Sequence, residues 1–154
     1  MSALTAAETL VEIGGKAFSN LQIQKLLYLA QMFYMGQHDR AMFDDDFEAW
    51  KLGPVVPSVY QHAKIYGSRP VGKLFTDRVY DQGGAERDML EKVVRELPDK
   101  SPWKLVSITH WDKGAWAKNY SQGDFGCTIP KQDILEEYKT RVQQATSRRS
   151  AVAQ

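Results

Sequence analysis

The stretch Glu48-Ala49-Trp50-Lys51-Leu52-Gly53-Pro54-Val55-Val56-Pro57-Ser58-Val59-Tyr60 decides the fold, because it places three structural signals close together. Trp50 lies close to two charged residues, Glu48 and Lys51, which is typical of a short strand with one face in the core and one in water. Gly53 and Pro54 are expected to end that strand. Pro57 suits the first position of a helix, since its φ is already near the helical value. We therefore expect a sharp reversal from strand to helix here.

Length and composition predict an ordinary globular protein. The chain has 154 residues, of which 43% are hydrophobic and 25% charged, enough for a core without disulfide or metal cross-links. We expect one domain over residues 1–144, followed by a flexible tail over residues 145–154. The net charge of +1 excludes a broad electrostatic attraction to nucleic acid, so we expect no nucleic-acid partner.

The lone cysteine, Cys127, cannot form an intramolecular disulfide, and zinc-ligand spacing is absent. No basic segment precedes the apolar residues at the N-terminus, and no run approaches the roughly 18 apolar residues of a membrane span. The acidic run Asp44-Asp45-Asp46 lacks the spacing of a calcium loop, so a solvated turn is favoured over a cation site. These observations predict a cytoplasmic protein without metal, cofactor or membrane contact.

Hydrophobic periodicity predicts a mainly α (α+β) fold, a compact bundle of about six to seven helices with a small β element around residues 43–52. The expected helices run from the capping pattern Thr5–Glu8 to Gly14, from Ser19 to Gly36, from Pro57 to Gly67, from Gly84 to Pro98, from Ser101 to His110, around Trp116, and from Pro130 to about Ala145. Residues 68–82 are expected to be irregular, with possible short strands.

The second of these helices should form the centre of the fold, because six apolar residues from Ile23 to Tyr34 recur at helical spacing. Four polar residues, Gln22, Gln24, Lys25 and Gln31, lie off that apolar stripe. In the last helix, the pair Glu137 and Arg141 is expected to face outward.

Catalysis has weak support in the sequence. Cys127, His110 and Asp112 allow a small Cys/His hydrolase to be imagined, but no local signature surrounds the cysteine. The simpler interpretation of His110 is a residue at a helix end that donates to a backbone carbonyl. A DNA-binding autoregulator is a further alternative, although no predicted helix concentrates Lys and Arg.

Several motifs carry a resemblance to a known family: the two blocks Asn20–Gln31 and Phe47–Tyr60, the residue Phe43, and the C-terminal elements Leu105–His110, Trp116 and Ile129–Tyr138. They closely resemble the Panacea domain, which is also called the SocA-like or GepA-like, phage-associated antitoxin family. The resemblance covers roughly residues 5 to 140, with Ile108 in place of the usual leucine.

The resemblance implies a bacterial or phage-borne antitoxin that binds and neutralises a toxin encoded beside it, and it implies no enzyme. SocA-type members act as proteolytic adaptors that deliver their toxin to the ClpXP protease, so ClpX is an expected second partner. Direct neutralisation without proteolysis is the alternative. Because the domain pairs with unrelated toxins, the motif does not identify the toxin.

Partner contacts are expected on the surface that the two blocks share. The predicted contact residues are Gln24, Lys25, Tyr28, Trp50, Lys51 and Tyr60. The alternative for Trp50 and Tyr28 is that they only lock helix to strand. Substituting Lys25 or Lys51 with glutamate is expected to spare folding and weaken binding. The residues assigned to structure and motif are Glu48, Gly53, Pro54, Pro57, His110 and Trp116.

Overall fold

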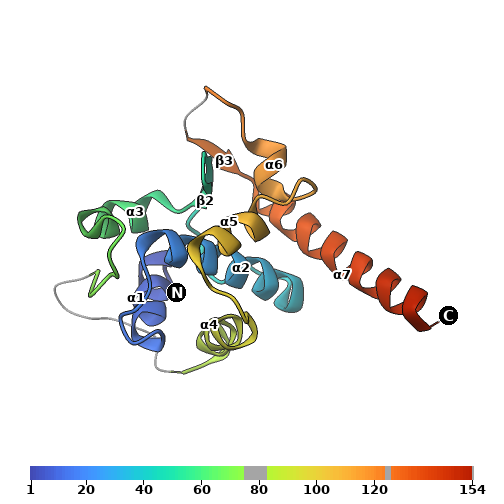
Figure 1. The fold of residues 1–154 in the computed structure, drawn as a ribbon, viewed down its shortest axis with the longest axis horizontal. Helices are drawn as coiled ribbons and strands as arrows, with labels where there is room; N and C mark the ends of the chain where they lie inside the picture. The colour runs from blue at the N-terminus through green and yellow to red at the C-terminus, as the bar shows by residue number, and fades with distance from the viewer. Residues whose placement is uncertain (75–82, 124–125, 154) are drawn as a thin grey trace.

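Helices dominate the computed structural model, which describes residues 1–74, 83–123 and 126–153 (Figure 1). The described helices are α1 (Ala3–Ile13), α2 (Asn20–His38), α3 (Pro57–Ala63), the 3-10 turn η1 (Lys64–Tyr66), α4 (Ala85–Glu96), α5 (Pro102–Thr109), α6 (Ala115–Asn119) and α7 (Lys131–Ala153). Together with one small sheet, they confirm the prediction of a mainly α fold with a minor β element.

The sheet has three short antiparallel strands, β1 (Phe47–Trp50), β2 (Gly53–Val55) and β3 (Cys127–Ile129), in the order β2-β1-β3. The expectation that Gly53 and Pro54 end the strand is wrong. Both belong to β2, where Pro54 lies opposite Ala49. An edge strand tolerates proline because one of its sides needs no ladder hydrogen bond. The two-residue turn between β1 and β2 therefore consists of Lys51 and Leu52.

Helix α2 runs through the centre of the fold and contacts α1, α3, α4, α5, α7 and β2. Its start is the predicted one: the Ser19 Oγ accepts from the Gln22 N–H at 3.3 Å, and the Gln22 side chain accepts from the Ser19 N–H at 2.9 Å. The end of α2 differs from the prediction. The helix continues past Gly36 and stops at Asp39, whose φ of 55° is left-handed. Gly36 has a packing role instead, since a Cβ there would lie 2.2 Å from the Tyr138 ring on α7.

Replacing Gly36 with alanine is expected to destabilise the protein by about 1–3 kcal/mol, the usual range for an overpacked contact. The loss should occur although alanine favours helix more than glycine does. Urea denaturation of Gly36→Ala, Tyr138→Ala and the double variant measures it. In the Tyr138→Ala background, Gly36→Ala should cost much less stability than it does in wild type, because the ring that clashes with the added methyl group is gone. Additive losses would show that Gly36 and Tyr138 are not coupled.

The other helix starts follow the sequence with one exception. Helix α1 is capped by Ser2, whose Oγ accepts from the Thr5 N–H at 3.1 Å, so the predicted cap at Thr5 is wrong. Helices α3 and α5 begin at Pro57 and Pro102 as expected. The irregular segment predicted for residues 68–82 lies outside the described residues from position 75 onward.

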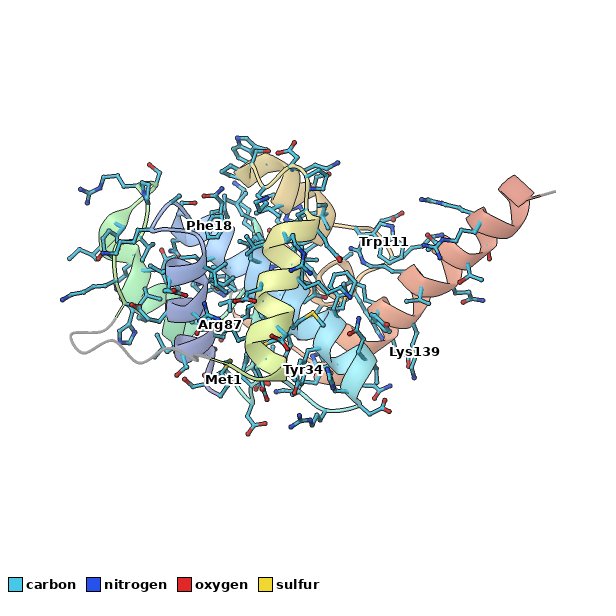
Figure 2. All side chains as sticks on the ribbon, turned by 90° about the horizontal axis from the view of Figure 1, so that it is seen from below. Met1, Phe18, Tyr34, Arg87, Trp111 and Lys139 are labelled. Carbon is cyan, nitrogen blue, oxygen red and sulfur yellow. The ribbon has the colours of Figure 1, made fainter. Side chains whose placement is uncertain are left out.

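Helix α7 projects away from the body of the molecule, and the C-terminus lies at its far end (Figure 1). Figure 2 shows this projection from a second direction, with Lys139 on the projecting helix. The helix continues past Ala145 to Ala153, so residues 145–153 are helical in the structure. The division of the chain after residue 144 stays a prediction.

Candidate functional site

Three of the four polar residues of α2 that lie off its apolar stripe are buried. Gln24 is 2% exposed, and Lys25 and Gln31 are fully buried. Each binds the backbone of a segment that follows α2. Gln31 donates to the Phe43 carbonyl at 2.9 Å and accepts from the Met42 N–H at 2.8 Å, which holds the loop before β1. Buried polar groups are retained when they satisfy such backbone groups.

Gln24 and Lys25 hold the β2–α3 connection. The Gln24 Oε1 accepts from the Val56 N–H at 2.9 Å, and the Lys25 Nζ donates to the Pro54 carbonyl at 2.9 Å. Burial lowers the pKa of Lys25 to about 7, because the charged ammonium is poorly solvated there. Gly53 makes room for this lysine: a Cβ at its φ of +116° would lie 3.0 Å from the Lys25 Cε.

A second buried cluster is centred on Glu137, which is 1% exposed, so the expectation that it faces outward is wrong. Its Oε1 accepts from the Tyr28 hydroxyl at 2.6 Å and from the Ala115 N–H at 2.8 Å, and its Oε2 accepts from the Arg141 Nε at 2.8 Å. Arg141 also donates to the Ile108 carbonyl at 2.7 Å. The cluster joins α2, α5, α6 and α7.

Tyr28 is fully buried within this cluster. Burial, and then the neighbouring Glu137 charge, raise the pKa of its hydroxyl. The structure thus favours the locking role for Tyr28 and leaves no surface for the partner contact that we predicted.

Aromatic side chains continue from this cluster to the β hairpin. The rings of His110 and Trp116 stack at 3.7 Å, and those of Trp116 and Tyr120 at 4.7 Å. The Trp116 Nε1 donates to the Trp50 carbonyl at 2.6 Å, and the Trp50 ring meets Tyr60 edge-on at 4.8 Å. Figure 2 marks Trp111 beside α7, where the Arg141 guanidinium lies 4.5 Å from its ring.

Glu48 supports the hairpin from its outer side. Its Oε1 accepts from the Trp50 Nε1 at 2.9 Å, and it lies close to Gly126, where a Cβ would be 3.1 Å from the same oxygen. This hydrogen bond orients the Trp50 ring.

A groove of about 680 Å³ lies between the hairpin, the start of α2 and the segment after α6; we call it the hairpin groove. Five of the six predicted contact residues line it. Its lining residues are Asn20, Leu21, Gln24, Lys25, Ala49, Trp50, Lys51, Leu52, Val55, Tyr60, Gly67, Ser68, Tyr120 and Gly123. Sequence reasoning missed Tyr120, whose place is fixed by its stacking on Trp116 and not by any local motif.

The buried and exposed members of the groove have different roles. Lys51 and Leu52 are exposed and Trp50 and Tyr60 are half-buried, so they can reach a partner. Gln24 and Lys25 form the floor. The expectation that Lys25→Glu spares folding has a wrong premise, because a glutamate here would bury a carboxylate beside the Pro54 carbonyl.

The imagined hydrolase is not assembled. No hydrogen bond joins Cys127 to His110 or Asp112 within residues 1–74, 83–123 and 126–153. His110 ends α5 and its ring stacks on Trp116. Burial, and then the Lys25 charge, lower the pKa of His110. His110 thus lies at a helix end, which is the position that the simpler interpretation gave it.

The described part of the chain lacks both a metal-ligand cluster and a membrane-spanning helix. It holds no group of three or more His, Cys, Asp or Glu side chains arranged to bind a metal ion. No described helix combines the length and apolarity needed to cross a bilayer.

Comparison with known proteins assigns the chain to a family. It is 32% identical over 108 residues to "Antitoxin SocA" of Caulobacter vibrioides (strain NA1000 / CB15N). That alignment covers 64% of this chain and 57% of the relative, so the chain spans little more than half the length of the curated relative it matches. No solved structure matches significantly. Residues 23–117, which include the hairpin and most of the groove, match the family model described as "Antitoxin SocA-like, Panacea domain", and the chain belongs to that family.

Proposed function

We propose that this protein is an antitoxin that binds its cognate toxin and neutralises it. The observation that carries the proposal is the hairpin groove, in which the two sequence blocks of the family meet beside exposed Lys51 and Leu52. A preformed concave surface held by buried hydrogen bonds loses little conformational entropy on binding, which favours tight association.

We propose further that the antitoxin works as an adaptor for the ClpXP protease in the cytoplasm. An adaptor needs a surface for the protease besides the one for the toxin, and the projecting half of α7 is available for that role. Its residues Val142, Gln143 and Ala145–Arg149 are exposed. Holding both partners at once raises the effective concentration of toxin at the protease.

Co-expression with the protein encoded by the adjacent gene tests the proposal. Expressed alone, that protein is expected to stop growth, and co-expression with this chain is expected to restore it. A Trp50→Ala/Tyr60→Ala variant should rescue at least tenfold fewer cells, because it removes the two rings on one side of the groove. The matched control is Trp103→Ala, which removes an exposed tryptophan from α5. An adjacent protein that is harmless, or toxic but not rescued, would refute the antitoxin assignment.

The protease step is separated by repeating the rescue in cells that lack ClpX. Delivery predicts that toxin accumulates and growth stops in those cells, while purified toxin still binds the antitoxin. Rescue that persists without ClpX would replace the adaptor mechanism with direct neutralisation.

A further inference from the structure

The hairpin groove has an apolar surface and charge of one sign. Aromatic side chains of Trp50, Tyr60 and Tyr120 line it together with Leu52, and the described part of its lining includes two lysines and no carboxylate. An apolar lining with a few polar groups is typical of sites that bury a specific ligand.

Several polar groups of the described lining remain available to donate hydrogen bonds to a ligand. Gln24 and Lys25 are already bonded to backbone groups. Lys51 forms no ion pair, and the Tyr60 and Tyr120 hydroxyls form no hydrogen bond, within the described part of the chain. One ammonium and two hydroxyls beside apolar side chains match a ligand with an apolar side chain and a carboxylate.

The dimensions favour a protruding segment of a larger molecule. The cavity of about 680 Å³ falls inside the range of about 300–1,000 Å³ for pockets that hold drug-sized ligands. Apolar side chains are exposed in the lining and near it: Leu52, in the lining, is 40% exposed, and Ile65, two residues before the lining residue Gly67, is 78% exposed. A small molecule confined to the groove would leave Ile65 uncovered.

We propose that the groove binds a short segment of the protein partner in which a large apolar side chain is next to an aspartate or glutamate. The proposal rests on the antitoxin function proposed above. The apolar side chain packs among Trp50, Tyr60 and Tyr120, and the carboxylate accepts from Lys51. Single-stranded nucleic acid also stacks on aromatic rings, but tracking its backbone takes a row of cations, and Lys51 is the one exposed lysine in the described lining.

A selection that uses no toxin tests this ligand chemistry. A library of random seven-residue peptides, displayed on phage, is selected on the purified protein and on Lys51→Glu. We expect wild-type protein to enrich peptides with Phe, Leu, Met or Trp beside Asp or Glu. A fluorescent copy of the most enriched peptide should bind Lys51→Glu about tenfold or more weakly in anisotropy titrations.

The matched control is Lys139→Glu, which makes the same charge change on the exposed surface of α7 and should bind the peptide as wild type does. Circular dichroism checks that both variants are folded. The proposal is overturned if no peptide is enriched, if basic peptides are enriched, if both variants weaken binding equally, or if oligo(dT) binds wild type more tightly than the peptide does. The selection contains no toxin, so the two proposals can fail separately. If the selection fails and co-expression restores growth, the proposed ligand chemistry is overturned. If the selection succeeds and co-expression does not restore growth, the antitoxin function is overturned.

Discussion

Glu137→Ala is expected to lower the free energy of unfolding by about 3–5 kcal/mol, the range for removing one partner of a buried ion pair. The substitution leaves the Tyr28 hydroxyl and the Ala115 N–H without their buried acceptor and Arg141 without its carboxylate. Because these groups belong to three different helices, the loss should be global. Urea denaturation followed by circular dichroism measures it.

Two further variants separate the cluster from a general effect of charge. Glu137→Gln keeps an oxygen that can accept from Tyr28 but removes the charge opposite Arg141. We therefore expect its free energy of unfolding to lie between that of wild type and that of Glu137→Ala. Glu136→Ala changes the exposed neighbouring carboxylate and should alter stability by no more than about 0.5 kcal/mol. Equal losses at Glu136 and Glu137 would contradict the role of the buried cluster.

The stability of wild type relative to Lys25→Met is expected to rise by about 2 kcal/mol between about pH 7.5 and about pH 9. In the folded protein Lys25 loses its proton near pH 7, whereas in the unfolded chain it keeps the proton to near pH 10.5. The unfolded chain therefore binds more protons in this range, and raising the pH favours the folded state. Below the folded pKa both states are charged, and the contribution of Lys25 no longer changes.

Urea denaturation at several pH values measures the difference between the two proteins. Methionine has a similar length but no titrating group, so other pH effects cancel in the comparison. Lys51→Met serves as the control, because it removes an exposed lysine of the same hairpin and should follow the wild-type pH dependence. A constant difference between wild type and Lys25→Met would show that Lys25 is solvated and charged throughout.

The parts of the fold that the sequence predicted depend on local chemistry. The capping box of Ser19 and Gln22 and the helix starts at Pro57 and Pro102 each need only the residues beside them. Strand β3 was missed because three residues gain their identity only by pairing with β1, far earlier in the chain.

The sequence predicted most of the residues of the candidate site but not which of them are buried. The family motifs brought Trp50, Lys51 and Tyr60 to attention, and the structure places them in one groove with Gln24 and Lys25. Hydrophobic periodicity predicts that polar side chains lie on the surface. It cannot show that a backbone carbonyl or N–H some thirty residues away will pair with a buried lysine or glutamine.

The two-residue turn of Lys51 and Leu52 has a consequence for how such a protein can evolve. Its two side chains are exposed, while the hydrogen bonds that shape the hairpin come from buried residues of α2. Changes in the turn can therefore accumulate with little cost to stability, and each one alters the surface offered to a partner. Under the proposed antitoxin function, a lineage that keeps the buried bonds can exchange one toxin for another through changes at these two positions.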